Sequence, residues 1–101
     1  MLLDVRVVSR KTPLDGKLEI SEAAAARLAL LGPGLVIVAA DQESPGAVEA
    51  LACTCGKREG GHVHHFVTSP SLRGLREGDE VHLDLDPDAR RVAILLTKGE
   101  R

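Results

Sequence analysis

The chain has 101 residues, a formal net charge of −2, one Phe and no Tyr or Trp. This length suits a single domain with a modest core, residues 1–101. The acidic balance gives no general attraction to nucleic acid or to an anionic membrane, and the missing aromatic side chains remove the platforms on which single-stranded nucleic acid stacks. We expect a cytoplasmic protein without a membrane partner, because the sequence shows neither a secretory signal nor an apolar run that could span a bilayer.

Alternation of apolar and polar residues predicts strands along most of the chain. In residues 80–86 the apolar side chains should point inward, with His82 on the solvated face. Residues 35–40 are apolar throughout, which is typical of a strand buried on both faces. Residues 10–15 and 41–46 are polar or turn-forming and should be loops. The six or seven strands expected lie at 2–9, 17–20, 35–40, 47–55, 62–67, 80–86 and 91–97.

One short α-helix is predicted over about residues 22–31. Ser21 is a typical N-cap residue, and Glu22 puts an acid in the first turn, where the helix dipole favours it. The Gly-Pro-Gly run at 32–34 should end the helix. A helical turn is expected near 70–76, where Pro follows a Ser cap. The buried stripe of the helix, with i, i+4, i+7 spacing, should be Ala24, Leu28 and Leu31.

These elements predict a mainly β protein, folded as a small bent sheet or barrel-like single domain with a short tail at 98–101. The first strand, Leu2 to Val8, carries apolar residues on both sides. Proteins cover, charge or pair the edge strands of an open sheet. We therefore predict that this strand helps to form a homodimer.

Two parts of the chain repeat one order of elements: strand, Ser cap, helix, Gly turn, strand. The first runs from Leu18 to Val38, and the second runs from Phe66 to Leu83 with a shorter helix. In the second, the run Leu72-x-x-Leu75-x-x-Gly78-Asp79-x-Val81 is similar to the Leu-x-x-Gly-Asp-x-Val run of AbrB-type swapped-hairpin domains. Two such halves would resemble the DNA-binding pseudobarrels, and the resemblance implies that fold and a nucleic-acid partner. Glu22 follows the Ser cap here, where such domains often place Pro and a basic residue.

The most distinctive motif is a Cys-x-Cys followed by a His-x-His. Residues 53–65 hold both cysteines and three of the four histidines, with a Gly-rich hexapeptide between Cys55 and His62. In the cytoplasm, two cysteines are more often thiols or metal ligands than a disulfide. A bridge between Cys53 and Cys55 would also be strained, since it would span only one residue of a strand.

Strand periodicity can bring these four side chains to one face. If the hairpin is centred between Arg58 and Glu59, Cys55 lies opposite His62 and Cys53 lies opposite His64. Opposed residues of antiparallel strands share a face. Leu51 and Phe66 would form the next pair and give the site an apolar floor. A register slip of one residue would break the arrangement.

Two thiolates with two imidazoles suit zinc better than magnesium or calcium, with Cu(I) and iron as alternatives. We therefore predict a zinc site formed by Cys53, Cys55, His62 and His64. Four protein ligands imply a structural ion, whereas three ligands plus water would allow Lewis-acid chemistry.

Other interpretations of the same residues stay open. The cysteines could be small core residues, or one could be a catalytic thiolate beside a histidine, although no third orienting group is evident. His65 should point to the other face of the hairpin. The basic pairs form a nucleic-acid patch only if the fold gathers them; they are Arg10-Lys11, Lys57-Arg58 and Arg90-Arg91.

The leading functional hypothesis is thus a small metal-binding protein with a structural or regulatory role. A DNA- or RNA-binding pseudobarrel regulator without metal is the less favoured alternative, given the charge. An enzyme that uses a cysteine or a metal-bound water is a second alternative, and no catalytic residue is predicted.

Overall fold

The computed structural model describes residues 1–52 and 63–97, which form eight strands, two α-helices and one 3-10 helix. The predicted tail at 98–101 lies outside these residues. In chain order the elements are β1 (Leu2–Val7), α1 (Lys11–Asp15), β2 (Lys17–Ile20), α2 (Glu22–Ala29), β3 (Val36–Ala39), β4 (Gln42–Pro45), β5 (Ala47–Ala52), β6 (Val63–Thr68), η1 (Pro70–Gly74), β7 (Glu80–Asp86) and β8 (Arg91–Leu96).

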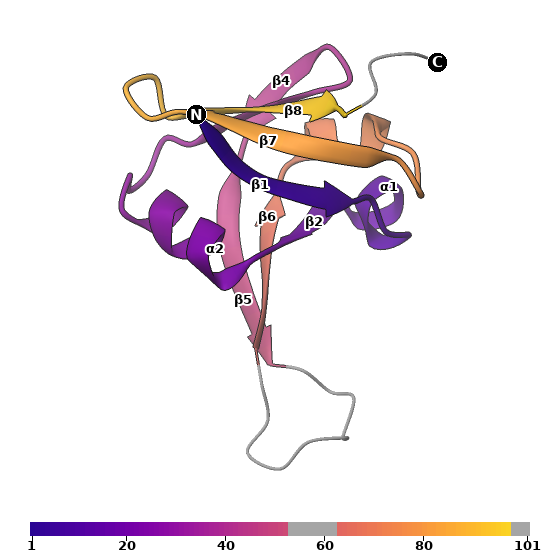
Figure 1. The fold of residues 1–101 in the computed structure, drawn as a ribbon, viewed down its shortest axis with the longest axis horizontal. Coiled ribbons are helices and arrows are strands. Elements are labelled where there is room, and N and C mark those ends of the chain that lie inside the picture. The colour runs from indigo at the N-terminus through magenta and orange to yellow at the C-terminus, as the bar shows by residue number, and fades with distance from the viewer. Residues whose placement is uncertain (53–62, 98–101) are drawn as a thin grey trace.

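The strands form two sheets (Figure 1). The first has five strands in the order β1-β7-β8-β3-β4, and the second has three in the order β2-β6-β5. Neighbouring strands are antiparallel, except for the parallel pair β3 and β8. The prediction of a mainly β single domain is confirmed. The described strands make two sheets, however, and not a closed barrel.

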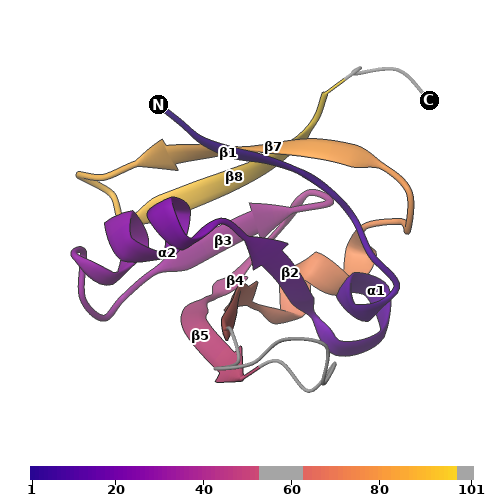
Figure 2. The same ribbon diagram turned by 60° about the horizontal axis from the view of Figure 1, so that its bottom comes forward.

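The chain passes from one sheet to the other between β4 and β5 (Figure 2), and the residue at this passage is Gly46. It separates the end of β4 from the start of β5. A Cβ atom added to Gly46 would lie 2.5 Å from Cγ1 of Ile37, a side chain with no exposed surface. A residue with a side chain would therefore push β5 away from β3. The close approach at Gly46 directs the β5–β6 hairpin toward β2.

The hydrophobic core lies between the two sheets and includes Leu28 of α2 and Leu72 of η1. The predicted alternation along β7 is confirmed, because its three apolar residues are at most 2% exposed and its acidic residues are exposed. With few aromatics, the core is built from aliphatic side chains. Its largest fully buried members are Leu18, Leu28, Ile37, Leu72, Leu83, Leu85, Val8, Val67, Val81 and Val92.

The helix predicted over 22–31 is α2, which ends two residues earlier. Ser21 is its N-cap, as predicted, and its Oγ accepts a hydrogen bond from the amide of Ala24 at 3.1 Å. The chain turns out of the helix because Leu31 N donates to Leu28 O, a tighter i to i−3 bond, and Gly32 follows at φ +73°. Ala24 and Leu28 of the predicted stripe are buried, and Leu31 is half-buried against the core.

Two segments expected to be loops are regular elements. Residues 11–15 form α1, whose buried Thr12 donates its hydroxyl hydrogen bond to Lys17 O at 2.7 Å. Residues 42–45 form β4, which pairs with β3 through a two-residue turn at Ala40 and Asp41. The sequence hides both elements because tertiary packing stabilises them against weak local propensity.

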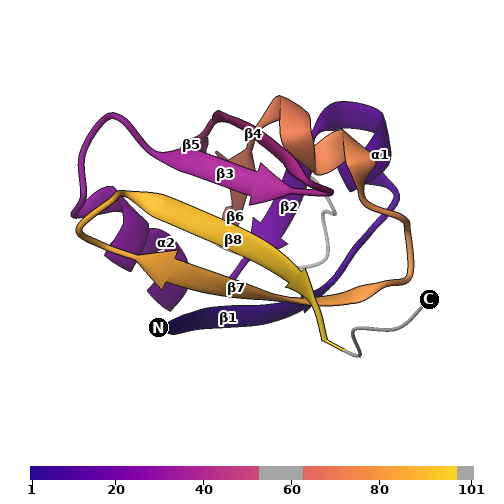
Figure 3. The same cartoon turned by 90° about the horizontal axis from the view of Figure 1, so that it is seen from above.

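The expectation that the strand at 35–40 is buried on both faces is wrong. In β3, Ile37 and Ala39 are buried, whereas Val36 and Val38 are half-buried. The reason is visible in Figure 3, in which no described helix lies over the outer face of the five-stranded sheet at β3 and β8.

The two parts of the chain with a repeated element order are interleaved in space. The first contains β2, α2 and β3, and the second contains β6, η1 and β7, as their sequences indicate. β2 pairs with β6. β1, which precedes the first half, pairs with β7, the last strand of the second half, whereas β5, which precedes the second half, pairs with β6 of that same half. Neither half could therefore form its sheets alone.

Candidate metal centre

The β5–β6 ladder, as far as the structure describes it, has a different register from the predicted one. Leu51 lies opposite His64, and Glu49 lies opposite Phe66. The predicted pairs of Leu51 with Phe66, and of Cys53 with His64, are wrong by two residues. Loop length alone suggested those pairs, whereas the ladder is fixed at its other end, by the passage at Gly46 and by pairing with β2. A shift of two residues preserves the alternation, so the two predicted faces of β6 are unchanged.

Only one of the four predicted ligands lies within the described residues. This is His64, which is half-buried on β6. Cys53, Cys55 and His62 lie outside them. In the sequence, Cys53 directly follows the last residue of β5, and His62 directly precedes the first residue of β6.

His64 contacts a carboxylate that the sequence did not point to. Its Nδ1 lies 2.9 Å from Oε2 of Glu19, a residue of β2 that is 45 positions away in the chain. The two side chains are 37% and 42% exposed, so the pair lies at the surface. Glu19 alternates with apolar residues in β2 and would pass for a solvated strand residue; its role depends on the pairing of β2 with β6, for which the sequence carries no signal.

A layer of charged side chains covers Phe66 beside this pair. Phe66 is 4% exposed although it points away from the main core. Glu19 and Glu49 lie directly opposite it on the two neighbouring strands. Lys11 Nζ lies 5.3 Å from the ring centroid, and Lys17 Nζ lies 3.1 Å from Oε1 of Glu49. Of the two residues predicted to form an apolar floor, Phe66 is thus covered by charges of both signs, and Leu51 is 41% exposed on the same face, opposite His64.

A cleft of about 470 Å³ opens next to His64. It lies between β2, the start of β6 and Arg6 of β1. His65 also lines it and lies opposite Ile20, on the other face of β6 from His64, as predicted. The remaining polar side chains of the cleft are those of Glu19, Ser21 and Glu22.

Within residues 1–52 and 63–97, no three His, Cys, Asp or Glu side chains converge so that they could hold a metal ion. The described residues therefore supply one predicted ligand and its carboxylate partner. The other three predicted ligands belong to residues 53–62, outside those ranges.

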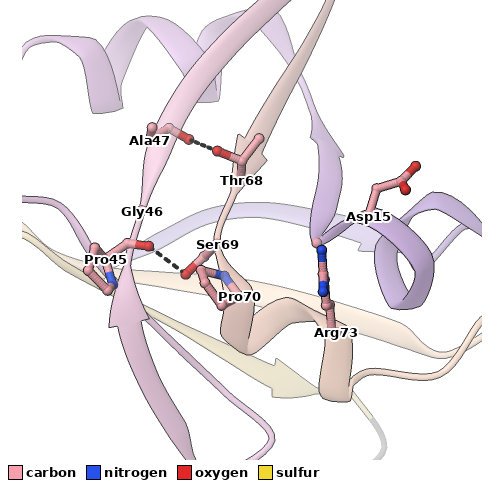
Figure 4. Close-up of a pocket in the computed structure, with 9 residues that line it drawn as sticks. Asp15, Pro45, Gly46, Ala47, Thr68, Ser69, Pro70 and Arg73 are labelled. Atoms are coloured by element: carbon pink, nitrogen blue, oxygen red, sulfur yellow. Dashed lines mark hydrogen bonds between the residues drawn. The ribbon is translucent and has the colours of Figure 1, made fainter.

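A second cleft, of about 420 Å³, lies beside Gly46 and η1 (Figure 4). Its Ser69 is buried and donates to Pro45 O at 2.8 Å, and Thr68 Oγ1 donates to Ala47 O at 3.5 Å. Ser71, also buried, donates to Ile37 O at 3.1 Å. A nucleophilic serine needs an adjacent base. The described bonds of the Ser69 and Ser71 hydroxyls go to carbonyls, to each other and to the hydroxyl of Ser44, which also accepts from the Ser71 amide; these bonds indicate a structural role.

The basic pairs do not gather into one patch in the described part of the chain. Arg10 and Lys11 lie at α1, whereas Arg90 and Arg91 lie at the turn between β7 and β8, at the opposite end of the five-stranded sheet (Figures 1 and 3). Arg91 also forms an ion pair with Glu43. Lys57 and Arg58 lie outside the described residues.

The described residues define a small, mainly β domain of two sheets. The longest helix among the described residues, α2, has eight residues, too few to cross a membrane. Comparisons with models of protein families, with curated proteins and with solved structures find no match to this chain.

Proposed function

We propose that this protein binds one zinc ion through Cys53, Cys55, His62 and His64, and that the ion cross-links the β5–β6 hairpin in a structural or regulatory role. The observation that carries the proposal is the contact between Glu19 and His64. Metal-ligating histidines usually donate the N–H of their second ring nitrogen to a carboxylate or carbonyl, which orients the ring and raises its basicity. Since Nδ1 of His64 contacts Glu19, a metal at His64 would be bound through Nε2.

The chemistry of the ligand set supports zinc. Thiolates and imidazoles together form tetrahedral zinc sites, with Zn–S distances of about 2.3 Å and Zn–N distances of about 2.0–2.1 Å. Cu(I) and iron are the competing ions for soft ligands. If only three side chains bind, a water molecule would take the fourth position and could act as an activated nucleophile.

The metal content of the purified protein, and its zinc affinity in a competition titration, test the proposal. We expect one zinc per chain. Glu19→Gln should weaken zinc binding about 10- to 100-fold, because it removes the carboxylate that contacts His64. Glu49→Gln is the matched control, since Glu49 lies on the other side of Phe66 and pairs with Lys17. Parent protein that neither retains nor binds zinc would refute the proposal. Equal losses of zinc affinity in the two variants would show that Glu19 has no specific role in binding the metal.

A nucleic-acid-binding regulator is the second candidate, and the pairing of β2 with β6, which joins the two halves, favours it. The separation of the two described basic pairs speaks against it. A binding assay with duplex DNA at several salt concentrations decides between the candidates, because phosphate contacts weaken steeply as salt is raised.

A further inference from the structure

The outer face of the five-stranded sheet carries a group of exposed apolar side chains. Val5 and Val7 of β1 are 45% and 62% exposed, and Leu95 of β8 is 44% exposed. Leu2, 62% exposed, lies with Val5 along one cleft on this face. Exposed apolar residues scattered singly are normal in proteins, but a contiguous group marks an interaction surface.

β7 presents a polar and acidic column between the apolar side chains of β1 and the outward residues of β8, which are Arg91, Ala93 and Leu95. Its outward side chains are those of Glu80, His82, Asp84 and Asp86, of which the three acids are exposed. Val5 and Leu95 lie directly opposite His82 on the two sides. The acidic column already holds one cation, because the amino group of Met1 lies 2.9 Å from Oδ1 of Asp84.

A cleft of about 390 Å³ on this face combines both kinds of side chain. Leu2 and Val5 form its apolar part, and His82, Asp84 and Thr97 form its polar part. A lysine or arginine side chain has the matching form, since its aliphatic stem packs on apolar surface while its charged end meets a carboxylate.

The edge of β1 is less suited to docking than the face. Asp4 accepts hydrogen bonds from the amides of Val5, at 2.9 Å, and of Ser21, at 2.8 Å. An added strand would have to compete with this carboxylate for the Val5 amide.

We propose that this face docks a helix of another protein, with basic residues along the middle of its contacting side and apolar residues flanking them. The columns of β1 and β8 should be about 10 Å apart, two strand spacings, which matches the width of a helix. A second copy of this chain, which the first strand suggested from its sequence, would bring two acidic columns together on this face. Charge complementarity therefore favours the basic partner.

The probe is a synthetic helical peptide of about 18 residues, with a Lys column between two Leu columns, added to the isotopically labelled full chain. We expect amide shifts in β1, β7 and β8, and a Kd that rises with salt. The double variant Val5→Thr, Leu95→Thr should weaken binding at least about tenfold, because it removes the apolar side chains that lie on the two sides of His82.

Two controls distinguish specific docking from non-specific hydrophobic binding. A peptide with Glu in place of Lys should not bind, and Leu30→Thr should change nothing, since Leu30 is 88% exposed at the end of α2, away from this face. Shifts elsewhere, or no shifts, would overturn the proposal. A dimer in sedimentation that the double variant abolishes would overturn it too, in favour of a second copy as the occupant.

Discussion

The side chain of Asp4 accepts a hydrogen bond from the backbone amide of Ser21 at 2.8 Å and thereby ties β1 to the start of α2. The second oxygen of Asp4 accepts from its neighbour's amide, Val5 N, at 2.9 Å. One half-buried carboxylate thus satisfies two amides, one of them in the residue that caps α2. The five-stranded sheet and the helix are joined at this point.

Asp4→Ala should therefore destabilise the fold. Two backbone amides lose their acceptor, and each hydrogen bond to a charged group contributes about 1.5–3 kcal/mol. We expect a loss of about 2–4 kcal/mol in the free energy of unfolding, measured by urea denaturation. Asp88→Ala, in the exposed turn before β8, is the control and should change stability by less than about 0.5 kcal/mol. Equal losses in the two variants would show that the Asp4 contacts contribute nothing specific.

Metal removal should lower the melting temperature of the parent protein. A zinc ion across the hairpin would be bound only in the folded state, so its binding free energy would stabilise the fold. The double variant Cys53→Ser, Cys55→Ser should melt like the chelated parent and should not respond to a chelator. A parent protein whose melting temperature ignores both chelator and added zinc would contradict this prediction.

Gly46→Ala should destabilise the protein by about 1–3 kcal/mol through overpacking, because the new methyl group would overlap Ile37. Ile37→Ala removes the opposing atoms and is itself costly, about 2–5 kcal/mol. The double variant should lose less free energy of unfolding than the sum of the two single losses, since the alanine at 46 would then have room. Strict additivity in the double-mutant cycle would rule out the contact as the cause.

Asp41→Gly should stabilise the protein. Asp41 has φ 62°, in a two-residue turn whose first residue, Ala40, also has positive φ. Such turns favour glycine, since residues with a side chain meet steric strain in the left-handed region. We expect a gain of about 0.5–1 kcal/mol after the entropy cost of glycine. Asp88 does not have a positive φ, so Asp88→Gly should destabilise the protein. A gain in stability of the same size in that variant would refute the explanation.

The sequence was enough to predict the parts of the fold that depend on interactions between neighbours in the chain. Ser21 as a cap and the alternation of β7 depend only on neighbours in the chain, and both are confirmed. α1 and β4 were predicted to be loops, because their sequences are polar or turn-forming and tertiary packing stabilises them.

In the candidate site too, the features that depend on nearby residues were predicted correctly, and those that depend on strand pairing were not. The two faces of β6 followed from strand period, so His64 and His65 are on the expected sides. The register followed from an assumed loop centre and was wrong by two residues. Glu19 was not predicted as a site residue, because its contact with His64 depends on a strand pairing between residues 45 positions apart.

The position of β8 has a consequence for how the molecule is made. β8 is the last described strand, yet it lies between β7 and β3 in the middle of the larger sheet. During synthesis, the pair β1–β7 and the hairpin β3–β4 remain separate until β8 leaves the ribosome and joins them. The parallel contact of β8 with β3 closes a loop of about fifty residues, which makes it slow to form. A nascent chain stalled before β8 would leave one edge of each incomplete sheet unpaired, as a substrate for chaperones or for aggregation.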